Sequence, residues 1–84
     1  MNLTGKCKAD FEAWLDGKTG TYDLLQDFSN LMGYSIYVET MNLGGYRSIV
    51  EDTTANTEYG LVVGSKYEAR DDVEDSFNTI YNAA

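Results

Sequence analysis

The side chains of this sequence that can do chemistry are one thiol and fourteen carboxylates, because the chain contains no histidine. Cys7 lacks a histidine to activate it as a nucleophile, and zinc or copper sites need histidine or paired cysteines. Carboxylates can hold a hard cation or form an acid–base pair, but no segment has the alternating ligands of a calcium loop. The residue types therefore predict no enzyme activity, no cofactor and no dedicated metal site.

The densest acids lie near the C-terminus, where like charges recur four residues apart and lie about 5 to 6 Å from each other on a helix. One interpretation is a solvated first turn, because negative charge is favoured at a helix N-terminus. The other is a row of carboxylates that imitates a phosphate backbone and binds in a basic groove. The acids in question are Glu68, Asp71, Asp72, Glu74 and Asp75, and Asp10, Asp16, Asp23 and Asp27 would extend the second arrangement.

Charge indicates the kind of partner. Fourteen acids face six lysines and arginines, which gives a net charge of −8. Nucleic-acid binding needs a basic stripe that displaces counterions, and anionic membranes attract basic segments, so we expect neither partner. The field steers the chain toward a basic protein. Tyrosine is enriched at interfaces, which makes Tyr37 and Tyr59 candidate anchors, although we favour simple half-burial in a domain this small.

The length bounds the architecture. A chain of 84 residues forms a single domain, residues 1–84, with room for one core. No apolar run has the length of a signal peptide or a membrane span, so we expect a protein of the host-cell cytoplasm. The lone Cys7 excludes an intramolecular disulfide.

The first predicted element is an amphipathic helix whose apolar residues recur at helical spacing. Thr4 is placed to cap its start and Gly17 to end it. This helix puts Cys7 on the buried stripe together with Phe11, which favours packing over reactivity for the thiol. The stripe consists of Cys7, Phe11, Trp14 and Leu15.

The segment from Tyr22 to Leu43 is ambiguous. Apolar residues up to Met32 follow helical spacing, with Thr21 as a possible cap. We favour a helix that continues, bent near Gly33, to the pair Gly44-Gly45. The alternative is a strand over residues 34–40, because these residue types favour strands.

Beyond the glycines, Tyr46–Glu51 and Glu58–Val63 read as an antiparallel hairpin joined by the polar loop Asp52–Thr57. Gly60 within the second strand suggests a bulge or a close backbone approach. Ser65 to Glu68 form a capping box, which predicts a closing helix over residues 66–82. The predicted fold is a small α+β domain in the order α-α-β-β-α, with helices covering one face of the hairpin.

These features resemble small proteins encoded by phages and prophages of Bacteroidetes-type bacteria, which share an opening motif, a tyrosine-rich middle segment and a closing helix. The chain departs from that pattern in lacking a proline before the middle segment and in having Thr40 and Met41 where aromatics are common. The matching residues are Lys6-Cys7-Lys8, Asp10-Phe11, Trp14, Met32, Tyr34, Ile36 to Glu39, Gly45, Glu68-Ala69-Arg70 and Ile80-Tyr81-Asn82.

The resemblance implies a phage or mobile-element origin, and it carries no known activity over to this chain. In that setting the expected function is a non-enzymatic acidic interaction protein that inhibits a host nucleic-acid-handling or defence protein. It would be anti-CRISPR-like, with nucleic-acid mimicry as its mechanism. The alternative is a structural or assembly protein, such as a small virion or homo-oligomeric component, in which the charge serves solubility.

Overall fold

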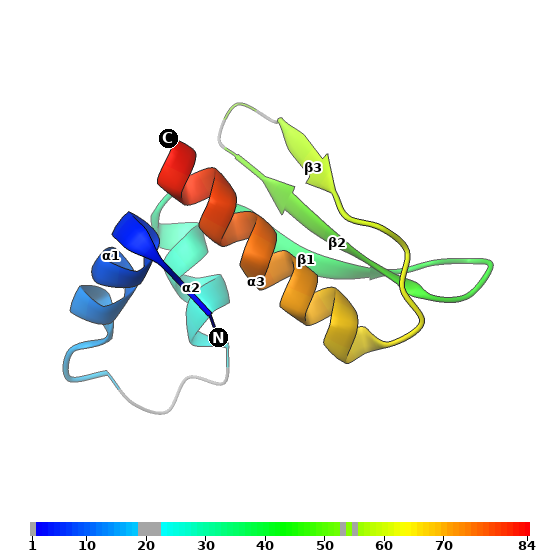
Figure 1. Cartoon of the computed structure of the whole chain (residues 1–84), viewed down its shortest axis with the longest axis horizontal. Helices are drawn as coiled ribbons and strands as arrows, with labels where there is room; N and C mark the ends of the chain where they lie inside the picture. Colours follow the sequence, from blue (N-terminus) through cyan, green and yellow to red (C-terminus); the bar gives the residue numbers. More distant parts are fainter. Residues whose placement is uncertain (1, 19–22, 53, 55) are drawn as a thin grey trace.

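Three helices and a three-stranded antiparallel sheet form the fold, which confirms the α+β class (Figure 1). The computed structural model describes residues 2–18, 23–52, 54 and 56–84. The sheet order is β1-β2-β3, and the element order α-α-β-β-β-α contains one strand more than the sequence predicted. The elements are α1 Gly5–Leu15, α2 Leu24–Leu31, β1 Ser35–Thr40, β2 Tyr46–Glu51, β3 Thr57–Tyr59 and α3 Lys66–Ala83.

The favoured prediction for the middle segment is wrong, and its alternative is confirmed, because α2 ends at Leu31 and β1 follows. Gly33 has a φ of +88° and donates to the carbonyl of Asn30 at 3.1 Å. The Tyr34 amide reaches the carbonyl of Ser29 at 2.8 Å. These two bonds make a Schellman motif, which ends the helix and turns the chain away from it.

The glycine pair that was expected to end a helix instead turns the β1–β2 hairpin. Gly44 and Gly45 have φ values of +96° and +90°, which other residues rarely adopt. The amide of Met41 donates to the carbonyl of Gly45 at 3.0 Å. This turn fixes the register in which Tyr37 lies opposite Ile49 and Val38 opposite Ser48.

The second hairpin confirms the predicted antiparallel pairing and the irregularity at Gly60, but β3 spans only Thr57–Tyr59 instead of the predicted residues 58–63, and Val63 forms an isolated bridge. Tyr59 pairs with Ile49 and Val63 with Tyr46, so three residues, 60–62, oppose two residues of β2. Gly60 donates to the carbonyl of Ser48 at 2.9 Å, and a side chain at Gly60 would overlap the Ser48 hydroxyl. Its close approach to β2 therefore requires glycine.

The core lies between the three helices and one face of the sheet (Figure 1). Phe28 is fully buried at its centre and makes edge-to-face contacts with Phe11 and Phe77, at 5.4 and 6.2 Å between ring centres. Ile36 and Val50 bring the sheet into this cluster. Such aromatic pairs supply stability beyond their buried area, which suits a domain this small.

The closing helix begins at the predicted residue, and the Ser65 hydroxyl caps it by accepting from the Tyr67 amide at 3.2 Å, but the Glu68 half of the predicted capping box does not form among the described residues. The start of α1 departs from prediction. Thr4 is its N-cap, but the Thr4 side chain makes no capping hydrogen bond. The cap comes instead from α3, where the side-chain Oδ1 of Asn82 accepts from the Cys7 amide at 2.8 Å. The expected cap Thr21 of the second helix lies outside the described residues.

Candidate protein-binding surfaces

The outer face of α3 carries four of the predicted acids. Ala69, Val73, Phe77 and Tyr81 are buried on the inner face of this helix. Helical periodicity therefore directs Glu68, Asp71, Asp72 and Asp75 away from the core, and Glu68, Asp71 and Asp75 are exposed. We call these four residues the acidic face.

Glu74 lies apart from the acidic face. Its side chain is partly buried, and burial is the main cause that raises its pKa; the charges of Asp71 and Asp23 raise the pKa further, whereas those of the N-terminal amino group and Arg70 lower it. Glu74 lines two hollows, one between α3 and the edge of β1 and one shared with Asp71 and Asp75. It is thus a desolvated carboxyl at the border between the acidic face and the sheet edge.

Most of the lysines and arginines have interaction partners away from the acidic face. Arg47 pairs with Glu39, and Arg70 pairs with Asp23 at 2.9 Å. Lys6 lies over the ring of Tyr81 and Lys18 over that of Trp14. Four of the six cations are therefore engaged elsewhere.

Two of the four acids proposed to extend the patch have structural partners instead. Asp10 accepts from the Tyr81 hydroxyl at 2.6 Å, and burial together with this bond raises the pKa of Tyr81 to about 12. Asp23 holds Arg70. Asp16 and Asp27 are exposed on the α1–α2 side of the molecule. The acidic patch that the sequence suggested is therefore limited to the acidic face of α3.

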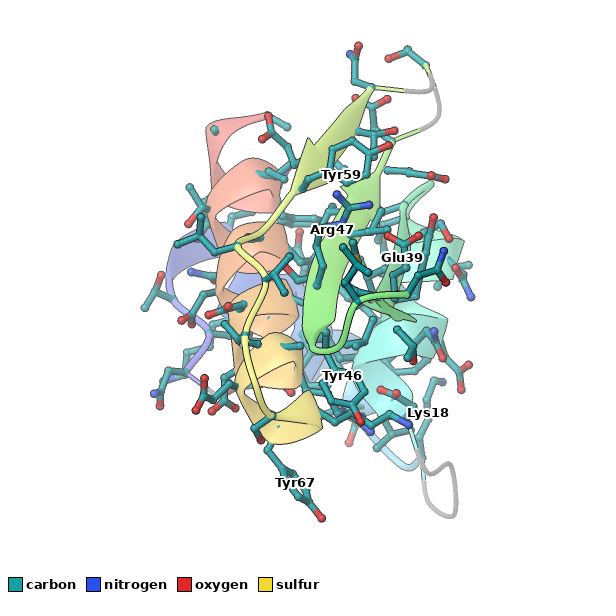
Figure 2. The ribbon with its side chains drawn as sticks, turned by 90° about the vertical axis from the view of Figure 1, so that its right-hand side faces the viewer. Lys18, Glu39, Tyr46, Arg47, Tyr59 and Tyr67 are labelled. Carbon is teal, nitrogen blue, oxygen red and sulfur yellow. The ribbon has the colours of Figure 1, made fainter. Side chains whose placement is uncertain are left out.

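The two predicted tyrosine anchors lie together on the uncovered face of the sheet. Tyr37 and Tyr59 flank Ile49 in one cross-strand row and are 38 % and 59 % exposed. Arg47 lies between Tyr59 and Glu39, with its guanidinium 4.5 Å from the Tyr59 ring centre (Figure 2). Ile49 is only 3 % exposed although no helix covers it, because these neighbours shelter it. We call Tyr37, Ile49 and Tyr59 the tyrosine row.

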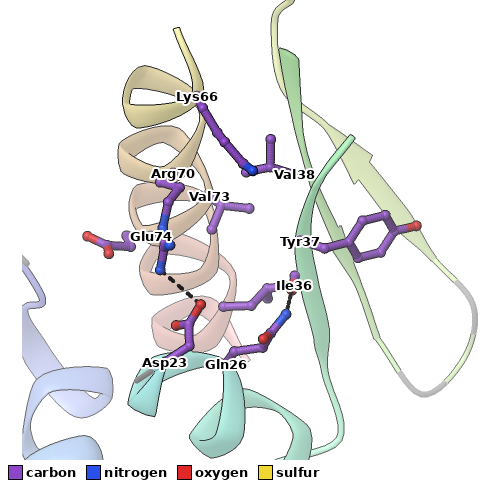
Figure 3. Close-up of a pocket in the computed structure, with 9 residues that line it drawn as sticks. All are labelled: Asp23, Gln26, Ile36, Tyr37, Val38, Lys66, Arg70, Val73 and Glu74. Atoms are coloured by element: carbon purple, nitrogen blue, oxygen red, sulfur yellow. Dashed lines mark hydrogen bonds and ion pairs between the residues drawn. The ribbon is translucent and has the colours of Figure 1, made fainter. Parts of the chain in front are cut away.

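The acidic face and the tyrosine row point in opposite directions. Alternation along β1 places Ile36 and Val38 on the side of α3 and Tyr37 on the other side (Figure 3). The sequence interpretation combined both sets of residues in one contact. The structure separates them by the thickness of the sheet and helix, so one flat partner surface cannot touch both.

Cys7 is buried against the core, as its position on the apolar stripe predicted. Burial, and secondarily Asp10, raises the pKa of the thiol, which makes the thiolate scarce at neutral pH. Within the described part of the chain, no three cysteine or carboxylate side chains are grouped to hold a metal ion. No helix in the described ranges has the length and apolar character to cross a bilayer.

Sequence reasoning missed the residues that organise these surfaces. Arg47 and Glu39 form the cross-strand pair that supports Tyr59. Glu51 accepts from the Tyr37 hydroxyl at 3.1 Å, and this hydrogen bond, ahead of burial and nearby carboxylates, raises the pKa of Tyr37. These residues alternate with buried neighbours along the strands. That alternation would have identified them if residues 35–40 had been predicted as a strand.

Comparison of the chain with protein-family models, with curated proteins and with solved structures gives no match. Functional inference therefore rests on the surfaces described above.

Proposed function

We propose that this chain is a non-enzymatic, phage-type inhibitor that binds a basic, nucleic-acid-handling protein of the host through the acidic face of α3. A CRISPR effector is a target of the required chemistry. The supporting observation is the acidic face itself, because three of its four carboxylates are exposed and no lysine or arginine forms a salt bridge with it among the described residues.

The spacing of the charges supports mimicry of a nucleic-acid strand. Residues 68 and 75 are seven positions apart, which is about 10.5 Å along a helix that rises 1.5 Å per residue. Four carboxylates over that length give about one charge per 3.5 Å. One strand of duplex DNA presents about one charge per 3.4 Å of its axis. A basic groove that follows a phosphate backbone would thus find a similar linear charge density.

The rigidity of α3 also favours binding through its acidic face. The inner face of α3 is anchored by Phe77 and Tyr81 in the aromatic core, so the acids are held on a fixed rod. Ordering a flexible acidic tail on binding would cost conformational entropy that a preformed helix avoids.

The test begins with capture of host proteins on the immobilised chain. Each captured protein is then purified and measured for release of labelled duplex DNA as the chain is added. We expect release that weakens steeply with added salt, because each charge contact displaces counterions. If the captured proteins keep their DNA when the chain is added at a saturating concentration, the proposal is contradicted.

A pair of charge-matched variants locates the contact. Reversal of Asp71, Asp72 and Asp75 to lysine changes the net charge from −8 to −2, since each reversal adds two charges. Reversal of the exposed acids Glu12, Asp16 and Asp27 gives the same net charge on another side of the molecule. Only the α3 variant should lose DNA release. Equal loss in both would assign the effect to net charge alone.

A second candidate function, homo-oligomeric assembly, is favoured by one observation. Leu43, Leu61, Val62 and Tyr67 are large apolar side chains that are all more than half exposed. Val62 lies against Gly45 at the turn of the first hairpin, and Tyr67 projects from the start of α3 (Figure 2). Sedimentation in high salt separates the candidates, since assembly through apolar contacts persists there whereas charge-driven binding weakens.

A further inference from the structure

We propose that Tyr37 and Glu51, on the uncovered face of the sheet, bind an arginine side chain of a protein partner. This site includes one end of the tyrosine row and lies on the side of the sheet opposite the acidic face. It goes beyond the proposed function and does not depend on it, because one flat partner surface cannot touch both sides of the molecule.

The same face already holds one guanidinium, which belongs to the chain itself. The guanidinium of Arg47 lies 4.5 Å from the centre of the Tyr59 ring, and its Nε donates to Glu39 at 3.1 Å (Figure 2). Arg47 comes from β2, whereas Glu39 comes from β1 and Tyr59 from β3. A ring and a carboxylate on the two outer strands therefore hold a guanidinium on this surface.

Tyr37 and Glu51 provide a ring and a carboxylate of the same kind. The Tyr37 hydroxyl donates to Glu51 Oε1 at 3.1 Å, so the carboxylate lies at the hydroxyl end of the ring. Tyr37 is exposed and projects from β1 away from α3 (Figure 3). Among the described residues, no lysine or arginine lies over the Tyr37 ring or forms a salt bridge with Glu51. The chain thus brings together two groups that bind a guanidinium without supplying the cation.

The charges on this face favour a cation as the occupant. Strand register and alternation place the side chains of Glu39, Arg47 and Glu51 on the same face as Tyr37. The other five lysines and arginines belong to α1, to the residues just after it or to α3, on the side of the sheet where the core lies. Arg47 pairs with Glu39, so Glu51 carries the excess charge of this face in the described structure.

The ionisation of Tyr37 agrees with these negative surroundings. Its hydrogen bond to Glu51, its burial, and the charges of Glu51 and Glu39 all raise the pKa of Tyr37. A negative potential of this kind disfavours a phenolate and favours a cation in the same place.

Arginine fits this pair of groups better than lysine does. Its planar guanidinium can stack on a ring while it donates to a carboxylate, as Arg47 does in this chain. A lysine ammonium is a strongly hydrated point charge without such a plane. A second copy of the chain is a poor source of the guanidinium, because its two arginines, Arg47 and Arg70, are both paired with carboxylates.

The test uses the unmodified protein and three synthetic peptides with blocked ends. They are Thr-Arg-Thr, Thr-Lys-Thr and an analogue with citrulline, which keeps the shape of arginine without its charge. Each peptide is titrated at low ionic strength while NMR records the ring signals of Tyr37 and the backbone amide of Glu51. We expect the arginine peptide to shift both signals, the lysine peptide to bind more weakly and the citrulline peptide to leave both signals in place.

Substitutions in the protein locate the contact. Tyr37→Leu should weaken the arginine peptide by about two- to fivefold, which is the range of a cation–π contact at an exposed site. Tyr37→Phe keeps the ring and should retain most of the affinity. Tyr67→Leu, which removes an exposed tyrosine at the start of α3, should leave the affinity at this site unchanged.

An isosteric pair tests the carboxylate. Glu51→Gln should weaken the arginine peptide by about two- to fivefold, as read from the Tyr37 ring. Glu12→Gln makes the same change of net charge at an exposed position on α1 and should have no effect there. Equal effects of the two variants would reduce the contact to general electrostatics and overturn the assignment of Glu51.

Three further outcomes would overturn the proposal. Equal affinity for arginine and lysine would remove the stacked guanidinium, and shifts confined to the acidic face would place the peptide elsewhere. Tyr37 signals that depend on protein concentration without peptide would show that a second copy covers the row. None of these outcomes involves Asp71, Asp72 or Asp75, which are reversed in the DNA-release test. Each proposal can therefore fail while the other stands.

Discussion

Asn82, near the end of the last helix, caps the first helix by accepting from the backbone amide of Cys7 at 2.8 Å. Its side-chain nitrogen donates to the carbonyl of Thr4 at 2.9 Å, so one side chain bonds both the N-cap residue and the first turn of α1. Asn78, one turn earlier, accepts from the Thr4 amide at 2.9 Å. A cap normally comes from the residue preceding the helix, whereas here it comes from 75 residues away.

Asn82→Ala should lower the free energy of unfolding by about 1 kcal/mol, because removal of a cap leaves helix amides without acceptors. Urea denaturation measures the change. Asn82→Asp keeps the acceptor for the Cys7 amide and adds a negative charge at the N-terminus of α1, but it loses the donor to the Thr4 carbonyl, so its stability should lie between those of wild type and Asn82→Ala. If Ala and Asp are equally destabilising, the bond to Cys7 is not the source of the stability.

Gly60→Ala should destabilise the domain by about 1 to 3 kcal/mol, because the added methyl group overlaps the Ser48 hydroxyl. Ser48→Ala removes that hydroxyl. The double variant should therefore be more stable than the sum of the two single effects predicts, and a double-mutant cycle by denaturation measures this coupling. If the effects of the two substitutions on stability are additive, the strain lies in the backbone of the bulge and not in the contact between residues 60 and 48.

The sequence predicted the elements whose signals are local. The apolar stripe of α1, strand β2 and the Ser65 cap of α3 lie where expected. The error at residues 34–43 arose because Leu31, Tyr34, Val38 and Met41 happen to fall at helical spacing. The positive φ of Gly33 decides the matter in the structure, and a single glycine is a weak signal in a sequence.

The candidate surfaces were harder to predict than the fold. Exposure of the acids on α3 follows from periodicity and needs no tertiary information. The separation of Tyr37 from the acidic face depends on which side of the sheet α3 covers, which sequence spacing does not determine. The binding of Asp10 to Tyr81 joins residues 71 positions apart and has no local signature.

Stability should depend on Tyr81 at alkaline pH. The pKa of Tyr81 is raised from its usual value of 10.0 to about 12, so the folded state holds this proton more tightly than the unfolded state. The resulting stabilisation is complete below pH 10 and is lost as the pH rises toward 12. The advantage of the wild-type chain over Tyr81→Phe should shrink across that window.

Denaturation at a series of pH values, with tyrosinate absorbance recorded in parallel, measures this dependence. Tyr81→Phe should also remove a tyrosine that ionises near pH 12. Tyr67→Phe is the control, because Tyr67 is exposed and makes no hydrogen bond through its hydroxyl in the described structure. A constant difference between wild type and Tyr81→Phe across the window would contradict the assignment.

The Cys7 thiol should resist alkylation in the folded protein at neutral pH, since it is buried and its pKa is raised. Its labelling rate then reports how often α1 opens. Asn82→Ala should accelerate labelling several-fold at a urea concentration well below the unfolding midpoint. Asn30→Ala, an exposed substitution on α2 away from the cap, should leave the rate unchanged.

The long-range cap has a consequence for biosynthesis. The start of α1 is made first, but the amide of Cys7 has to wait for Asn82 to leave the ribosome before it finds its acceptor. Closure of such distant contacts is slow relative to local helix formation. The nascent chain would therefore carry an uncapped first helix until α3 is available, and α1 would gain its native cap only then.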